Sequence, residues 1–111
     1  MAMADLNNLA PDEMDSMMEQ VRDAAGFLKA LAHEGRLMML CHLVSGEKTV
    51  TEFETLLSMR QPAVSQQLMR LRSDGLVTAR REGKAIYYAI ADPRVAQVVS
   101  TLHEMFCPDE K

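Results

Sequence analysis

The sequence lacks the short motifs that mark the common enzyme classes. It contains no glycine-rich phosphate loop, no nucleophile elbow and no HExxH metal motif. No run of residues approaches the roughly 20 apolar positions that a membrane-spanning helix needs. The N-terminal residues also lack the basic and apolar regions of a secretion signal. We therefore expect a cytoplasmic protein that is not an enzyme, has no membrane segment and uses no cofactor.

Cysteine is also scarce, because only Cys41 and Cys107 occur among the 111 residues. In a cytoplasmic chain, cysteines serve more often as free thiols, metal ligands or redox sensors than as a permanent disulfide. The two residues therefore either fill space in a core or carry chemistry.

Basic residues are fewer than acidic ones, but they are concentrated in one stretch. The chain has 12 basic and 16 acidic residues, which gives a net charge of -4. Residues 60–84 hold six basic and two acidic residues, so this stretch carries +4 and the rest of the chain -8. Such a chain presents a positive surface to a phosphate backbone, while its acidic remainder limits non-specific binding.

The basic stretch opens with a predicted helix over residues 61–73. Val64, Leu68 and Leu71 have the i, i+4, i+7 spacing of one buried helical face. The opposite face is polar, which suits base edges in a major groove, because glutamine pairs with adenine and arginine with guanine. The candidate DNA contacts on this face are Ser65, Gln66 and Arg70.

A shorter helix is predicted just before this one. Thr49 and Glu52 have the spacing of a capping box, in which each side chain accepts a hydrogen bond from the other residue's backbone N–H. Two short helices joined by a tight turn at residues 58–60 form a helix-turn-helix. The second of them, residues 61–73, would enter the groove.

A β-hairpin is predicted directly after the helix-turn-helix. Its strands run over residues 76–81 and 84–90, around a turn at Glu82 and Gly83. Glycine supplies the left-handed backbone conformation that a tight hairpin turn needs. The hairpin carries three cations that would reach phosphates or the minor groove. These cations are Arg80, Arg81 and Lys84.

Residues 33–44 predict another helix, with an apolar face toward the core. Leu37, Leu40 and Val44 share that face with Cys41 at helical spacing, so Cys41 is expected to point inward. His33, at the start of this helix, is expected to cap it or to pack against it.

Two further amphipathic helices flank this module. One begins near Asp12 with a methionine-rich stripe, and the other opens at Asp92 and Pro93 and ends at Cys107. The central module already has a core, so these helices have only each other or a second subunit to cover. A two-fold homodimer follows, and it would place two recognition helices on successive turns of a duplex.

The predicted fold is mainly α with a small β-hairpin wing, in the form of a winged helix-turn-helix that dimerises through its N- and C-terminal helices. A hydrophobic content of 48% in 111 residues supports one domain with a small core. We expect a flexible N-terminal tail over residues 1–11, the DNA-binding and dimerisation domain over residues 12–107, and a C-terminal tail over residues 108–111.

The order of these elements, together with the run QPAVSQQLMRLRSDGLVTARREGKAIYYAI, resembles the ArsR family of small dimeric winged-helix repressors. The resemblance covers about residues 20–106 and implies operator DNA as the partner. Arg60 stands where the family often has a serine that caps the recognition helix. The DNA contacts that the resemblance implies are Gln61, Ser65, Gln66 and Arg70 in that helix, with Arg80, Arg81 and Lys84 in the wing.

The metal sites of the family lack their ligands in this chain. Thr49 and Thr51 stand near the positions where a thiol-rich site needs cysteines, and Met105 stands where a terminal-helix zinc site needs a histidine. We therefore predict no metal site of either kind.

Cys41 and Cys107 resemble the dithiol of the sulfide-responsive SqrR and BigR branch of the family. That resemblance implies that reactive persulfides link the two cysteines through sulfur and lower the affinity for DNA. A disulfide needs Cα atoms within about 7 Å, so thiols held slightly farther apart would respond to persulfides and resist simple oxidants.

Three other interpretations stay open at this stage. In the first, Cys41 is simply a buried core residue. In the second, the protein is an interaction module that does not bind DNA. The third is a metal sensor, because His103 and Cys107 are four residues apart on one helical face and Cys41 is adjacent to His42. Its ligands would be Cys41, His42, His103 and Cys107.

Overall fold

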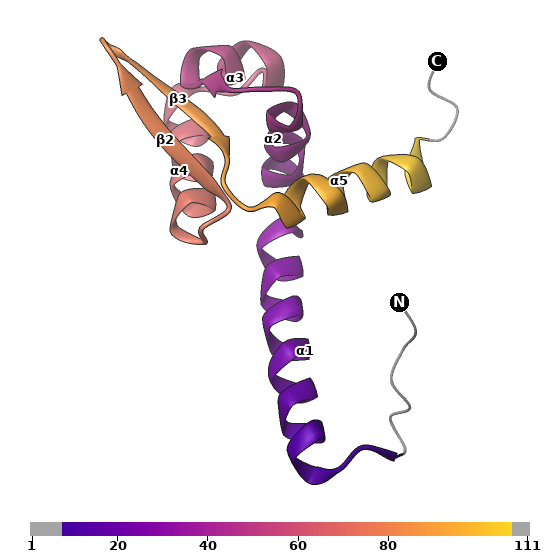
Figure 1. Ribbon diagram of the computed structural model, residues 1–111. Coiled ribbons are helices and arrows are strands. Elements are labelled where there is room, and N and C mark those ends of the chain that lie inside the picture. Colours follow the sequence, from indigo (N-terminus) through magenta and orange to yellow (C-terminus); the bar gives the residue numbers. More distant parts are fainter. Residues whose placement is uncertain (1–7, 108–111) are drawn as a thin grey trace. The chain divides into compact units, whose positions relative to one another are not determined.

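The structure is a computed structural model of the chain, and it describes residues 8–107. The chain divides into two compact units, the first ending at Ala32 and the second beginning at His33. The first unit contains α1 (Pro11–Leu31). The elements of the second unit are α2 (Glu34–Val44), β1 (Lys48–Thr49), α3 (Val50–Leu57), α4 (Gln61–Ser73), β2 (Val77–Glu82), β3 (Ala85–Ile90) and α5 (Pro93–Phe106) (Figure 1).

The two predicted tails fall largely outside the described part of the chain. The predicted N-terminal tail ended at Pro11, which instead opens α1. Its first seven residues and the predicted C-terminal tail, residues 108–111, lie outside the described residues. The tails therefore stay predictions.

Helix α1 begins one residue before the position expected from the sequence. The side chain of Glu13 accepts a hydrogen bond of 2.8 Å from the backbone N–H of Ala10, which satisfies one donor at the helix start. The predicted apolar stripe is largely exposed, with Met18, Val21 and Leu28 each more than half accessible. A stripe of this kind needs a partner surface to stay out of water.

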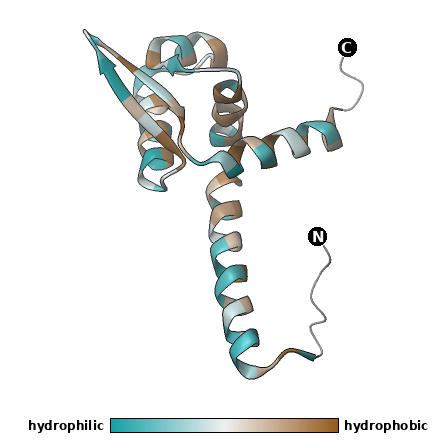
Figure 2. Cartoon of the chain, viewed as in Figure 1, coloured by the Kyte–Doolittle hydropathy of each residue, from teal (hydrophilic) through white to brown (hydrophobic). Residues whose placement is uncertain are grey.

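Helix α2 buries a face different from the predicted one. His33 does cap the helix, because its Nδ1 accepts a hydrogen bond from the backbone N–H of Arg36 at 3.4 Å. The core, however, receives Met39, Leu40 and Leu43, while Cys41 is exposed. The prediction of an inward Cys41 is therefore wrong. Figure 2 shows α2 to be mostly hydrophobic beyond its first turn, so its periodicity did not distinguish a buried face from an exposed one.

The helix-turn-helix forms as the sequence predicts. Thr49 and Glu52 make the capping box of α3: the backbone N–H of Thr49 donates to Glu52 Oε1 at 2.8 Å, and that of Glu52 donates to Thr49 Oγ1 at 3.1 Å. Helix α4 has the predicted bounds and the predicted fully buried face of Val64, Leu68 and Leu71. Arg60 precedes it without a side-chain cap, so the helix start relies on proline at its second position.

The wing is a hairpin of β2 and β3 whose turn contains Gly83 at φ +63°. The strands are antiparallel, and Arg80 lies opposite Tyr87. A third strand, β1, pairs with β3 and completes a sheet of order β1-β3-β2. This two-residue strand is too short to produce an alternating pattern, so the sequence did not reveal it.

Helix α5 begins and ends as predicted. Asp92 caps it by accepting a hydrogen bond from the backbone N–H of Arg94 at 2.9 Å, and the N–H of Cys107 closes its last turn on the carbonyl of His103 at 2.7 Å. The first turns are buried through Val95 and Val99 against the rest of the second unit. The far end is open, and Phe106 is 74% exposed. The observed fold is a winged helix-turn-helix, mainly α with a small antiparallel sheet.

Candidate DNA-binding surface and cysteine pair

The polar face of α4 presents the residues that the sequence predicted for base contacts. Gln61 is exposed, and its Nε2 donates a hydrogen bond of 2.7 Å to Oγ of the half-buried Ser65. Arg70 is exposed and forms an ion pair of 3.2 Å with Asp74 one turn later. Gln66 lies between them on the exposed side. The recognition helix therefore has a side-chain hydrogen bond in its first turn, an accessible amide in the middle and a guanidinium in its last turn.

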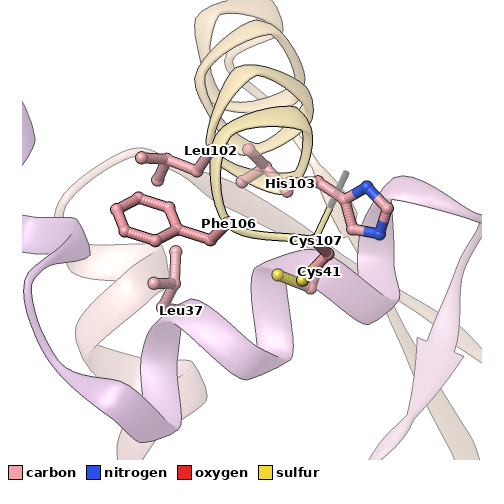
Figure 3. Close-up of a pocket in the computed structure, with 7 residues that line it drawn as sticks. Leu37, Cys41, Leu102, His103, Phe106 and Cys107 are labelled. Carbon is pink, nitrogen blue, oxygen red and sulfur yellow. The ribbon is translucent and has the colours of Figure 1, made fainter. Parts of the chain in front are cut away.

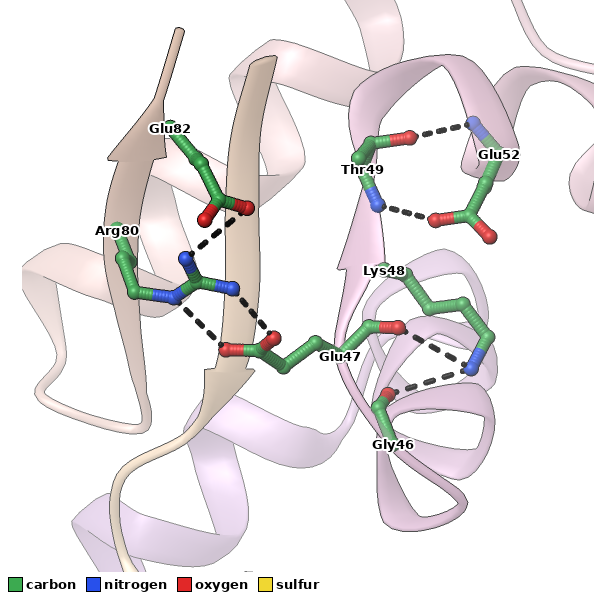
Figure 4. Close-up of polar contacts among 7 residues, drawn as sticks. All are labelled: Gly46, Glu47, Lys48, Thr49, Glu52, Arg80 and Glu82. Atoms are coloured by element: carbon green, nitrogen blue, oxygen red, sulfur yellow. Dashed lines mark hydrogen bonds and ion pairs between the residues drawn. The ribbon is translucent and has the colours of Figure 1, made fainter.

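The three cations predicted for the wing are not equivalent. Arg81 and Lys84 are exposed near the hairpin turn. Arg80 instead makes two hydrogen bonds to the carboxylate of Glu47, at 2.8 and 3.3 Å, and an ion pair of 3.4 Å with Glu82 (Figure 4). Its hydrogen bonds to Glu47 raise the pKa of Arg80 and lower the pKa of Glu47. No sequence pattern pointed to Glu47, which lies 33 residues away in the chain.

Cys41 and Cys107 come together from two different helices. Cys41 lies on α2 and Cys107 directly follows α5, and both line a cavity of about 260 Å³ (Figure 3). Figure 3 shows their sulfur atoms turned toward each other beside Leu37 and Phe106. The remaining lining residues are Val99, Leu102 and His103. The structure thus brings together the two thiols that the sequence singled out.

Burial beside the cavity raises the pKa of the Cys41 thiol, and the nearby negative charge of a Cys107 thiolate raises it further. Both causes act against the anion, because an apolar wall solvates a thiolate poorly and a second thiolate repels it. At neutral pH Cys41 is therefore mostly the thiol, which is the less reactive form.

The four residues of the alternative metal site do not converge. His103 lines the cavity that holds both cysteines. His42 lines a separate groove, which it shares with Leu56 and Leu57 of α3. Neighbouring residues on a helix point about 100° apart, so Cys41 and His42 face different partners. Within residues 8–107, no group of three or more histidine, cysteine, aspartate or glutamate side chains is placed to hold a metal ion.

A helix-turn-helix with an exposed polar face, followed by a basic wing, defines a winged-helix DNA-binding protein. Comparison with known proteins gives its family. Residues 33–79 match the family described as "Bacterial regulatory protein, arsR family". The biofilm growth-associated repressor of Agrobacterium fabrum is 42% identical over 98 residues, which cover 88% of this chain and 84% of that protein.

The transcriptional activator HlyU of Vibrio cholerae is 37% identical over 98 residues, covering 88% of this chain and 91% of that protein. The crystal structure of the transcriptional repressor BigR from Xylella fastidiosa superposes with a TM-score of 0.78 and 41% identity, covering 84% of this chain and 95% of that one. This chain therefore belongs to the arsR family of bacterial regulatory proteins. It is a DNA-binding transcriptional repressor of the BigR type, not an enzyme.

None of the helices between residues 8 and 107 is long and apolar enough to cross a membrane.

Proposed function

We propose that this repressor acts as a homodimer and senses reactive sulfur species through Cys41 and Cys107. The observation that carries the proposal is the shared cavity, which one thiol enters from α2 and the other from the residue directly after α5. A sulfur bridge between them would join two helices of the same unit covalently. Modification of the thiols would then lower the affinity of the dimer for its operator.

Exposed apolar side chains support the homodimer. Helix α1 exposes Met18, Val21 and Leu28, and the end of α5 exposes Met105 and Phe106. Soluble proteins rarely leave such a series of large apolar side chains in water unless a partner covers them. To bind successive major grooves, such a two-fold dimer needs its two α4 helices about 34 Å apart, one turn of a duplex.

The sulfur chemistry balances with persulfides as the only co-reactant. Each cysteine thiolate attacks the terminal sulfur of a persulfide RSSH, takes up that sulfur and releases the thiol RSH. The two cysteine persulfides then condense: one attacks the other, a trisulfide forms between Cys41 and Cys107, and hydrogen sulfide leaves. The protein gains one sulfur atom and loses two hydrogen atoms.

The apolar cavity favours small, uncharged sulfur donors. Its walls are mostly aliphatic and aromatic side chains, which give a charged reagent no counterion. Each inserted sulfur also lengthens the bridge by about 2 Å, so a persulfide-derived bridge spans thiols that stand too far apart for a disulfide. We expect persulfides to act at concentrations at which peroxide has little effect.

The change in DNA affinity that regulation needs is modest. Allosteric coupling free energies are typically about 1 to 3 kcal/mol. A bridge between α2 and the end of α5 supplies a coupling free energy of this size if it shifts the two α4 helices away from the spacing of successive major grooves. Helix α2 also packs in the core through Met39 and Leu40, so a shift of α2 reaches the DNA-binding module directly.

The test is intact-mass analysis after separate treatment with a persulfide, hydrogen peroxide or zinc, paired with DNA binding. We expect persulfide to add one sulfur, remove two hydrogens and weaken binding. Cys41→Ser and Cys107→Ser should each bind DNA like the wild type and lose the response to persulfide. Loss of binding in untreated Cys41→Ser would instead show a structural role for the thiol.

Zinc serves as the control for the metal alternative. A stoichiometric metal that survives buffer exchange and shifts DNA affinity would replace the sulfur mechanism. Facile formation of a disulfide with peroxide, accompanied by full release of DNA, would contradict the proposed selectivity for persulfides.

A further inference from the structure

Arg80 is bound on three sides within the protein. Its Nε and one terminal nitrogen hold the two carboxylate oxygens of Glu47, its other terminal nitrogen lies 3.4 Å from Glu82, and its guanidinium carbon lies 4.8 Å from the ring centre of Tyr87. A two-point arginine–carboxylate contact fixes orientation as well as distance. A DNA phosphate could reach Arg80 only by competing with two carboxylates.

The sheet register places Arg80 and Arg81 on opposite faces of the wing, because side chains alternate along a strand. Arg80 lies opposite Tyr87, and Arg81 lies opposite Ile86. Arg81 shares its face with the buried Val77, and β2 packs on that side against the core. Arg81 therefore points to the α4 side of the wing, whereas Arg80 points to the outer side.

The charges on the two faces also differ. Arg80 with Glu47 and Glu82 forms a cluster of net charge -1, which would repel a phosphate backbone. The lowered pKa of Glu47 keeps its carboxylate ionised through the neutral range. Arg81 and Lys84 have no such acidic partners in the described chain. The positive potential of the wing therefore comes from these two residues.

The backbone on both sides of Glu47 is fixed by hydrogen bonds and by strand pairing. Ser45 Oγ donates to the carbonyl of His42 at 2.8 Å, and Lys48 Nζ donates to the carbonyl of Gly46 at 3.2 Å. Lys48 itself begins β1 and pairs with Tyr88 of the sheet. Glu47 thus connects the end of α2 to the outer face of the hairpin through Arg80 (Figure 4).

We propose that Glu47 is a positioning residue that holds the wing in place through Arg80, and that the wing contacts DNA phosphates with Arg81 and Lys84 rather than with Arg80. The inference uses the DNA-binding function of the family and does not depend on the thiol chemistry. It gives the three wing cations different roles, whereas the sequence analysis predicted contact with phosphates or the minor groove for all three.

The test compares Glu47→Gln with the matched variant Glu82→Gln, using fully reduced protein. Each variant removes one negative charge beside Arg80, but only Glu47 joins the hairpin to another segment. The probe is a fluorescent duplex that this protein has selected from a random-sequence library. Glu47→Gln should weaken binding by about two- to fivefold, the range of an exposed ion pair, even though it removes a negative charge. Glu82→Gln should leave affinity unchanged or slightly raise it.

Salt titration separates positioning from phosphate contact. Arg81→Gln and Lys84→Gln should each lower the slope of log affinity against log salt by about one for each phosphate that the side chain neutralises in the wild type. Arg80→Gln should weaken binding without changing that slope. A reduced slope in Arg80→Gln, or unchanged or tighter binding by Glu47→Gln, would overturn the proposal.

Hydrogen exchange in the free protein gives a readout that needs no DNA. Backbone amides of β2 and β3 should exchange faster in Glu47→Gln than in the wild type, and the same amides in Glu82→Gln should match the wild type. Equal exchange in all three proteins would show that Glu47 does not hold the wing, and the proposal would then be wrong.

Discussion

Cys41 illustrates how one side chain takes its chemistry from its neighbours. The residue is exposed, yet its thiol lies against an apolar cavity that raises its pKa. Only the thiolate is a strong nucleophile, so the site slows the reaction of Cys41 at neutral pH. A sensor built in this way would depend on reagents that enter the cavity.

The prediction at the residue scale concerns the pH dependence of Cys41 alkylation. In the folded protein, the rate at which iodoacetamide alkylates Cys41 should rise at a higher pH than in the urea-unfolded chain, because both burial and Cys107 favour the neutral thiol. In Cys107→Ser the midpoint should fall but stay above the unfolded value, since burial remains. Peptide mapping by mass spectrometry measures the rate at Cys41 alone. If the pH midpoint of alkylation in the folded protein lies at or below that of the unfolded chain, the pKa of Cys41 is not raised by folding.

At the scale of elements, α4 is the part of the chain in which sequence and structure agree most closely. Its buried face anchors the helix through Val64, Leu68 and Leu71, and its exposed face carries Gln66. A helix held in this way presents its polar face in a fixed orientation. Fixed orientation matters because base recognition needs hydrogen bonds of defined geometry.

Gln66 provides a prediction for this element. Gln66→Ala should lower the discrimination between the selected duplex and single-base variants by about 1 to 3 kcal/mol at one position, and the salt slope should stay unchanged. Gln67→Ala is the matched control, because Gln67 is the adjacent glutamine and is less exposed. Competition binding with a panel of duplexes measures both. If the two substitutions have equal effects on discrimination, Gln66 does not make a specific base contact.

At the scale of the whole molecule, the exposed apolar surface belongs mostly to α1 and to the end of α5. The second unit has its own core, which includes Phe53 and Leu68, whereas the stripe on α1 remains open. Association of two chains would cover that stripe. Because the buried fraction of the surface rises with size, oligomerisation would also increase the apolar surface that this domain buries.

Val21 tests the dimer. Val21→Glu would bury an unpaired carboxylate in each half of a two-fold interface, so the dimer dissociation constant should rise at least about a hundredfold and DNA binding should weaken with it. Gln20→Glu adds the same charge at a neighbouring position off the apolar stripe and should leave the dimer intact. Sedimentation velocity across a concentration series measures both variants. A dimer that survives Val21→Glu would exclude an interface through the α1 stripe.

The success of sequence-based prediction follows the range of the interactions involved. The cap at Thr49, the buried face of α4 and the turn at Gly83 depend on residues within a few positions of one another. The exposure of Cys41 depended on which of two apolar faces of α2 the core would use, so it could not be predicted. Strand β1 and the pair of Glu47 with Arg80 depend on contacts between distant segments.

The sequence alone was enough to predict the winged helix-turn-helix and the basic stretch, and to single out the two cysteines as candidate sensing residues. Helical period, turn chemistry, charge and residue type can all be read locally along the chain. Tertiary structure decided that Cys41 and Cys107 share a cavity and that His42 faces elsewhere. It also decided that Arg80 is engaged by Glu47 while Arg81 lies on the other face of the wing. These outcomes depend on how helices and strands pack, and packing is set by the whole chain at once.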